Sequence, residues 1–142
     1  MRSAFAIGLA ALSSILLASP SAAQMTAGEI EYQQACASCH GVLGKGDGPV
    51  AGVLEVEVPD LTKIKERHNG EFPFYRLMQM IDGRSEQTRL QAHGDTMPVW
   101  GSRFMADSLT AGSGTKTDIV IAEINTYGRL ASLVYYLESL QE

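Results

Sequence analysis

Five consecutive residues, Cys36-Ala-Ser-Cys39-His40, constrain this chain more than any other feature of its 142 residues. They contain both cysteines of the sequence, separated by two small residues and followed at once by a histidine. Two cysteines are too few for a disulfide scaffold of several bridges, and they cannot supply a four-thiolate metal site. The chemistry of the motif must therefore come from the two thiols and the imidazole together.

Two thiols at this spacing near a helix end can each form a thioether with one vinyl group of a single haem, and the next imidazole then lies beneath the iron. Other uses of the motif fit less well. A thioredoxin-like pair follows a strand, and none is predicted before Cys36. A zinc site needs a second ligand pair, which His68 and His93 do not form. A plain disulfide leaves His40 without a role. We therefore expect one covalent haem c, bound through Cys36 and Cys39, with His40 as an iron ligand.

The first 23 residues have the pattern of a secretory signal peptide. Arg2 precedes an uncharged apolar run over residues 4–18, and small residues at 21–23 form a cleavage site. The run has about 15 residues, fewer than the roughly 20 that a permanent transmembrane helix needs. We predict cleavage after Ala23, export to the periplasm and no membrane span afterwards, with an uncleaved anchor as the alternative.

The remaining residues, 24–142, have the size of one domain. Without Arg2 the 11 basic residues become 10, and with 16 acidic residues the charge is −6. A nucleic-acid partner requires a basic face, so this class of partner is excluded.

The hydrophobic pattern predicts an all-α domain without strands or repeats. Helices are expected at about 27–38, 60–68, 72–81, 99–106 and 120–140. Glycines and prolines between residues 41 and 59 predict an ordered loop. Gly128 in the last helix costs about 1 kcal/mol relative to alanine, so a break or kink is expected there. The apolar stripe of that helix comprises Val120, Ile124, Tyr127, Leu130, Ala131, Val134, Leu137 and Leu140.

Over essentially its whole mature length, the chain resembles the class I (monohaem) c-type cytochromes of bacteria. The specific motif is Cys36-Ala-Ser-Cys39-His40-Gly41. Three supporting segments are Gly44-Lys-Gly-Asp-Gly-Pro49, Met97-Pro-Val-Trp100-Gly101 and Leu133-Val-Tyr-Tyr136-Leu137. The resemblance implies a small cytochrome c fold, with helices wrapped around one haem and the N- and C-terminal helices crossing. It also implies that Gly28 and Tyr32 meet Leu133, Tyr136 or Leu137 at that crossing.

The second axial iron ligand is expected to be Met97. The candidates are Met25, Met78, Met80, Met97, Met105, His68 and His93. Met97 lies in a loop bounded by glycine and proline, where a thioether can be oriented without helical constraint, and the resemblance places the distal ligand at this Met-Pro. Met78 and Met105 fit packing positions on helices, and Met80 lies on the same helix as Met78 without a clear assignment. His93 is the second choice.

The resemblance also suggests residues that support the haem. The carbonyl of Pro49 would accept the second imidazole proton of His40. Trp100, Arg84 and Arg103 are candidates for contacts with the haem propionates, because buried carboxylates need donors or cations. A packed indole and ordinary surface arginines are equally good interpretations of these three residues.

Ligation by His40 and Met97 closes both axial positions, so we expect a periplasmic electron carrier and not an enzyme. Its partners would be a redox donor and an acceptor protein, bound transiently. Two alternatives stay open: a haem c subunit of a larger oxidoreductase complex, with a membrane-bound oxidase or dehydrogenase as partner, and a haem protein whose displaceable sixth ligand admits a small molecule. The four lysines, Lys45, Lys63, Lys65 and Lys116, are too few for a lysine-rich docking face.

Overall fold

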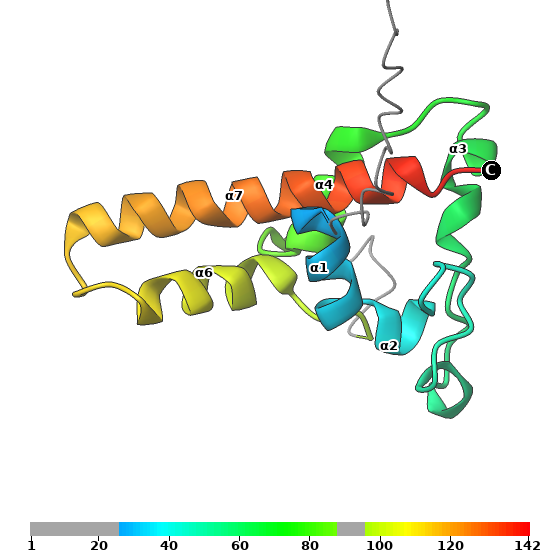
Figure 1. Cartoon of the computed structure of the whole chain (residues 1–142), viewed down its shortest axis with the longest axis horizontal. Coiled ribbons are helices and arrows are strands. Elements are labelled where there is room, and N and C mark those ends of the chain that lie inside the picture. The colour runs from blue at the N-terminus through cyan, green and yellow to red at the C-terminus, as the bar shows by residue number, and fades with distance from the viewer. Residues whose placement is uncertain (1–25, 88–95) are drawn as a thin grey trace, which may run out of the picture.

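The computed structural model describes residues 26–87 and 96–142, so the predicted signal peptide at 1–23 lies outside the described residues. The described residues form six α-helices, two 3-10 turns and no strand, which confirms the all-α class (Figure 1). The helices are α1 (Ala27–Ala35), α2 (Ala37–His40), α3 (Ile64–Arg67), α4 (Phe74–Asp82), α6 (Trp100–Thr110) and α7 (Lys116–Ser139). The 3-10 turns are η1 (Ala51–Val53) and η2 (Leu61–Lys63).

Helix ends follow local capping signals. The hydroxyl of Thr26 accepts a hydrogen bond from the Glu29 amide at 3.2 Å, which starts α1. A reciprocal capping box between Thr115 and Asp118 starts α7. Gly83, with φ of 63°, ends α4 in the left-handed conformation expected from the sequence. These boundaries are decided within four or five residues of chain.

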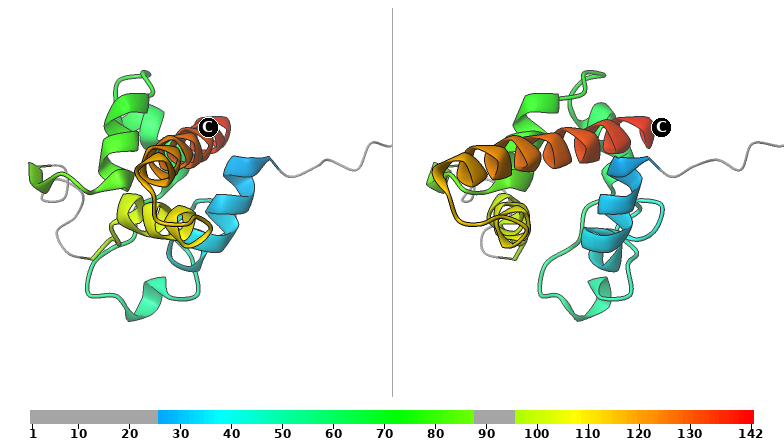
Figure 2. Two further views of the ribbon diagram at one scale, coloured as in Figure 1. Left: turned by 90° about the vertical axis from the view of Figure 1, so that its left-hand side faces the viewer. Right: turned by 60° about the vertical axis from the view of Figure 1, so that its left-hand side comes forward.

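The long helix α7 organises the molecule. The helix α1 crosses its C-terminal half, and α6 runs antiparallel to its N-terminal half, so that α6 and α7 project as a hairpin (Figures 1 and 2). The helix α4 packs on another side of α7. No helix in residues 26–87 and 96–142 is long and apolar enough to cross a membrane.

The crossing of the N- and C-terminal helices depends on Gly28. A Cβ atom at this position would lie 1.9 Å from the carbonyl oxygen of Ser132, so only glycine permits this approach. The rings of Tyr32 and Tyr136 pack beside it, with centroids 5.3 Å apart. The expected meeting of Gly28 and Tyr32 with Tyr136 is therefore confirmed.

Arg129 joins three helices. Its guanidinium lies over the Phe104 ring of α6, 4.0 Å from the centroid. It also donates to Glu31 of α1 at 2.6 and 2.9 Å, and to Asp107 of α6 at 3.2 Å. Stacking and charge-assisted hydrogen bonds together fix α1 and α6 against α7.

The expected break at Gly128 is wrong, because α7 continues without interruption from Lys116 to Ser139. Thr126 and Leu130, on either side of Gly128, are completely buried. Tertiary packing on both sides outweighs the cost of about 1 kcal/mol for one glycine in a helix.

The predicted apolar stripe of α7 is only half correct. The buried residues are Ala122, Thr126, Leu130, Leu133, Val134 and Leu137, whereas Val120, Ile124 and Tyr127 are exposed. In the N-terminal half of α7, the small residues Ala122 and Thr126 are the buried ones. The hydroxyl of Thr126 donates a hydrogen bond to the Ala122 carbonyl at 2.8 Å, so this buried polar group has a partner. Two apolar faces compete in this segment, and periodicity does not decide which one α6 covers.

Candidate cofactor site

The Cys-x-x-Cys-His motif occupies the junction of α1 and α2. The amide of Cys36 donates to the Tyr32 carbonyl at 2.8 Å, and the Cys36 carbonyl accepts from the amides of Cys39 at 3.1 Å and His40 at 2.9 Å. The predicted helix 27–38 is therefore interrupted at Cys36 and continues to His40. These hydrogen bonds hold the two thiols and the imidazole within about one helical turn.

Gly41 directs the chain away immediately after the motif. Its φ of 80° and ψ of 159° belong to a region that only glycine occupies readily. A Cβ atom here would also lie 1.9 Å from Oδ1 of Asp47. The buried hydroxyl of Tyr32 donates to the Gly41 carbonyl at 2.7 Å, and burial raises the pKa of this phenol, so it remains a donor. Tyr32 thus anchors the turn that follows His40.

A cavity of about 270 Å³ lies against the motif. Cys36, Cys39 and His40 form one part of its lining, and Met97 belongs to the same lining. Other lining residues are aliphatic side chains of the 54–61 loop, α4 and α7, including Val56, Leu61, Leu77, Ile81, Leu133 and Leu137. The four predicted site residues therefore meet at one predominantly apolar cavity.

Pro59, and not Pro49, supplies the carbonyl beside His40. Nδ1 of His40 lies 3.3 Å from the Pro59 oxygen. The loop containing Pro49 instead runs along α2, where the Gly48 amide donates to the Cys39 carbonyl at 3.1 Å. Because a carbonyl can only accept, Nδ1 carries the proton and Nε2 is the nitrogen with a lone pair for a metal. The expectation for Pro49 is wrong because the loop is long enough to return ten residues later.

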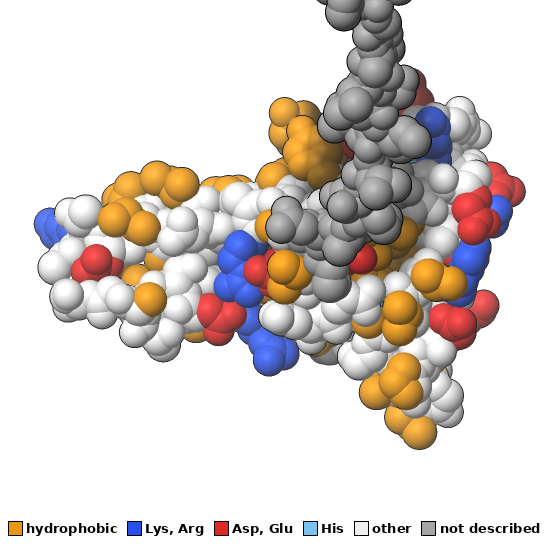
Figure 3. Space-filling model, in the orientation of Figure 1, with side chains coloured by type: hydrophobic (Ala, Val, Ile, Leu, Met, Phe, Trp, Pro, Cys, Tyr) orange, Lys and Arg blue, Asp and Glu red, His pale blue; other side chains and the backbone are white. Residues whose placement is uncertain are grey.

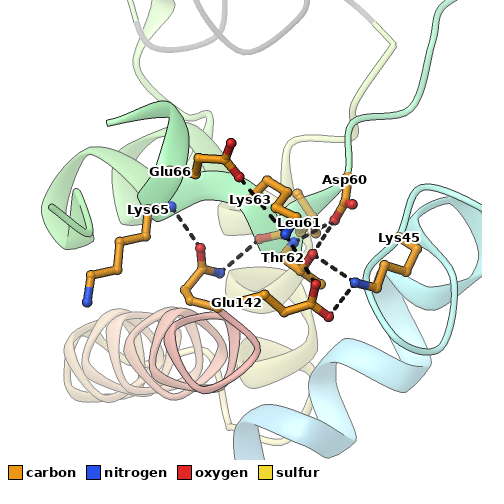
Figure 4. Close-up of polar contacts among 9 residues, drawn as sticks. Lys45, Asp60, Leu61, Thr62, Lys63, Lys65, Glu66 and Glu142 are labelled. Carbon is orange, nitrogen blue, oxygen red and sulfur yellow. Dashed lines mark hydrogen bonds and ion pairs between the residues drawn. The ribbon is translucent and has the colours of Figure 1, made fainter. Parts of the chain in front are cut away.

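The C-terminus fixes the segment that follows Pro59. The side chain of Gln141 donates to the Leu61 carbonyl at 2.9 Å and accepts from the Lys65 amide at 2.8 Å. The backbone amide of Glu142 donates to the Thr62 carbonyl at 3.2 Å. Figure 4 shows this cluster at the end of α7. Two terminal residues thereby hold the chain that delivers Pro59 to the imidazole.

Both cysteines are free thiols in this structure. Burial, together with the nearby Glu31 and Cys39, raises the pKa of Cys36 to about 12. A redox dithiol has the opposite property, a lowered pKa that generates the attacking thiolate. The environment of Cys36 therefore gives no support to a thioredoxin-like function.

Met97, Trp100 and Arg103 approach the cavity from the beginning of α6 and the turn before it. Met97 is half-buried and packs against the core. The Arg103 guanidinium lies 5.0 Å from the centroid of the Trp100 ring. The two residues form a cationic and aromatic pair at the cavity, suitable for binding a carboxylate.

Arg84 has a structural role instead. It donates to Asp82, and its Nη1 and Nη2 atoms bond Glu123 at 2.7 and 2.9 Å, which joins the end of α4 to α7. These two carboxylates raise its pKa. Arg84 does not line the cavity, and its guanidinium is occupied by this pairing.

The other methionines differ in their positions. Met78 packs against the core, and Met105 receives a contact from the Thr126 hydroxyl at 3.9 Å, as expected for packing residues. Met80 lines the cavity, whereas the sequence places it only on the same helix as Met78. Its spacing of three residues from buried Leu77 was the signal that could have identified it.

Within the described residues, no histidine other than His40 lines the cavity. Nδ1 of His68 lies 2.8 Å from the Ile64 carbonyl at the end of α3, outside the cavity lining. His93 and also Met25 lie outside the described residues. Within residues 26–87 and 96–142, no group of three His, Cys, Asp or Glu side chains could hold a metal ion.

One apolar cavity is lined by the two thiols of the motif, by an imidazole oriented through Nδ1 and by a thioether. This set of groups suits a covalently attached haem. Combined with the small helical fold, these groups are the features expected of a protein that binds haem covalently. The sequence model described as Cytochrome c matches residues 25–103, more than half of the chain, and the chain belongs to the cytochrome c family. The match includes the motif and Met97 and ends in α6. Searches of curated proteins and of solved structures found no match.

Membership of this family confirms the resemblance found in the sequence, and the class I monohaem type is consistent with it. Proteins of the family bind haem c covalently and use it for electron transfer.

Proposed function

We propose that this protein is a periplasmic one-electron carrier with a single haem c. Cys36 and Cys39 would hold the haem through thioethers, and His40 and Met97 would be its axial ligands. The observation that carries this proposal is that Met97 and His40, 57 positions apart in sequence (97 − 40), line one apolar cavity. The composition supports a single haem, because the sequence of 142 residues contains two cysteines and one Cys-x-x-Cys-His motif.

When bound, the haem supplies reversible one-electron chemistry at its iron. The protein residues set the conditions for it. The Pro59 carbonyl accepts a hydrogen bond from the Nδ1–H group of His40, which fixes the ring orientation and increases the basicity of Nε2. A thioether at the other axial position favours the reduced form and raises the potential. The Arg103–Trp100 pair would receive a haem carboxylate.

Two observations support export. Cytochrome c domains are typically exported, and residues 1–23 have the pattern of a signal peptide. We propose that cleavage after Ala23 releases the domain into the periplasm, where covalent haem attachment also protects the thiols from disulfide formation.

Docking to donor and acceptor proteins would be weak and largely apolar. Val42, Leu43, Val53 and Val56 are exposed on the loop after the motif, and Val56 also lines the cavity. Lys45 and Lys63 both pair with Glu142, which neutralises part of the few basic charges on this side (Figure 4). A small contact area is usual for transient electron-transfer encounters.

The test is optical spectroscopy of the exported, haem-loaded protein in both oxidation states. Met97→Ala should abolish the charge-transfer band of a thioether-ligated ferric haem. Met80→Ala is the matched control, because Met80 lines the same cavity on α4, and should retain the band. Cys36→Ser with Cys39→Ser should leave no haem that resists extraction.

Three results would overturn the ligand assignment. Loss of the band in Met80→Ala alone would assign the thioether to Met80. A wild type with two nitrogen ligands would favour a histidine such as His93. Carbon monoxide binding by the ferrous wild type would indicate an open or displaceable position, and thus ligand binding instead of electron carriage.

A further inference from the structure

The helix α7 carries a second apolar seam that is largely exposed in the described structure, where only Tyr135 at its C-terminal end makes a ring contact, with Phe74 of α4 at 4.7 Å between centroids. Its residues are Ile121, Ile124, Gly128, Ala131 and Tyr135, separated alternately by three and four positions. The exposed fractions are 50% for Ile121, 64% for Ile124 and 63% for Tyr135. A repeat of three and four residues is the pattern by which one helix packs along another.

Gly128 lies at the middle of this seam and has no role in the described fold. A Cβ atom added there would meet nothing within 4 Å. Glycine in a helix costs about 1 kcal/mol relative to alanine, and Gly128 itself makes no close contact within one copy of the chain that would require a glycine. A second helix that crosses at this point could approach closely, as α1 approaches α7 at Gly28 in the same molecule.

The helices α1, α4 and α6 pack on other sides of α7 (Figure 2). The seam lies opposite the buried residues Thr126, Leu130 and Leu133 and, apart from the contact of Tyr135 with Phe74 of α4, is left open. Hydrophobic side chains are visible along the α7 edge of the projecting hairpin in Figure 3. Because the hairpin projects from the body, a partner can reach this edge without contacting the haem cavity.

We propose that the seam binds a second copy of this chain, with the two α7 helices antiparallel and the twofold axis at Gly128. Residues equally distant from Gly128 then face each other. Ile121 meets Tyr135 of the second copy, each seven positions from Gly128. Ile124, four positions before Gly128, lies near Ala131 of the second copy, three positions after it. Large residues therefore face small or planar ones, so the seam is complementary to itself, as a twofold interface requires.

The size of the apolar surface agrees with a weak dimer. Beside the seam on one flank lie two further exposed apolar side chains, Val120 and Tyr127. Together with the seam they present on the order of 500 Å² per copy, which is as large as the largest apolar patch of a typical monomer. Two copies would bury about 1,000 Å², near the lower limit of specific interfaces.

Charges beside the seam are also complementary. Lys116 and Glu138 are exposed, and neither forms an ion pair within residues 26–87 and 96–142. Lys116 precedes Gly128 by about 18 Å along the helix axis and Glu138 follows it by about 15 Å. At 3.6 residues per turn both lie on the same flank of the seam. An antiparallel pair thus places each Lys116 beside Glu138 of the other copy.

The test measures the molar mass of the haem-loaded mature protein by light scattering and sedimentation, from micromolar to millimolar concentration at physiological ionic strength. We expect a concentration-dependent increase toward twice the monomer mass. Ile124→Lys should raise the dissociation constant about tenfold or more. Val53→Lys, an equally radical change on the distant 51–53 turn, should leave it unchanged.

A charge exchange distinguishes this arrangement from nonspecific association. Lys116→Glu alone should weaken the dimer, and adding Glu138→Lys should restore it, because the pair is re-formed in reverse. A wild type that stays monomeric at millimolar concentration overturns the proposal. So does a dimer that Ile124→Lys does not weaken, or whose charge-exchanged double variant is no stronger than Lys116→Glu. Haem spectra should be identical in all variants, so failure here is distinguishable from failure of the proposed electron-carrier site.

Discussion

Nδ1 of His40 lies 3.3 Å from the carbonyl oxygen of Pro59, nineteen residues later in the chain. The contact depends on the C-terminus, because Gln141 and Glu142 hold the backbone at residues 61–65. The electronic environment of the imidazole is therefore linked to the far end of the sequence.

Gln141→Ala should raise the reduction potential of the haem-loaded protein. The substitution removes the side-chain bonds to Leu61 and Lys65, loosens Pro59 and weakens the hydrogen bond that makes His40 a better donor to the oxidised iron. Stability should fall by about 1–2 kcal/mol. Electrochemical titration and denaturant unfolding measure the two effects. Gln34→Ala, an exposed change on α1, is the control, and an unchanged potential in Gln141→Ala would disprove the linkage.

Gly41→Ala should strongly reduce the yield of haem-attached protein. Its backbone conformation is nearly restricted to glycine, and the new methyl group would collide with Asp47. Gly114→Ala is a matched control, because Gly114 also has a positive φ, 77°, but a Cβ there meets nothing within 4 Å. The control should lose only about 1 kcal/mol and keep normal haem content. Equal yields from the two variants would show that the turn after His40 tolerates rearrangement.

Gly28→Ala should destabilise the crossing of α1 and α7. The methyl group would lie 1.9 Å from the Ser132 carbonyl, so the helices must separate, at a cost of about 1–3 kcal/mol. Gly52→Ala, where a Cβ meets nothing within 4 Å, should be nearly neutral. Denaturant unfolding of the haem-loaded variants gives the comparison. A neutral Gly28→Ala would mean that the crossing is wider in solution.

Glu123→Gln should reduce the loss of stability in acid. Hydrogen bonds from Arg84 hold the pKa of Glu123 below its ordinary value in the folded protein. The resulting stability is present above the unfolded pKa of about 4.3 and is lost as the pH falls through the folded value. The difference between wild type and variant should be below about 1 kcal/mol, because the pair is partly exposed.

Unfolding measured from pH 7 to pH 3 should therefore show the wild type converging on Glu123→Gln as the solution becomes acidic. Glu71→Gln, at an exposed acid outside this cluster, should follow the wild type throughout. Parallel curves for wild type and Glu123→Gln would show that the Arg84 pair contributes nothing to acid sensitivity.

Local signals were enough to predict much of this molecule. Thr26 and Gly83 mark helix ends through contacts within a few residues, and the all-α class follows from them and from helical periodicity. The haem motif was also recognisable, because thioether attachment and iron ligation are combined in five consecutive residues. The axial role of Met97 stays a prediction, supported by its place on the cavity.

The sequence by itself thus determined the helical class, the cofactor motif and the family. Only the tertiary structure decided that the carbonyl beside His40 comes from Pro59 and not from Pro49. The same holds for Arg84, which pairs with Glu123 of α7 and does not line the cavity. It also holds for α7 itself, in which Ile124 is exposed and Thr126 is buried. The physical reason is the same in each case. Helix caps and covalent attachment are decided by neighbours along the chain, whereas these three contacts depend on how distant segments pack, which no local pattern encodes.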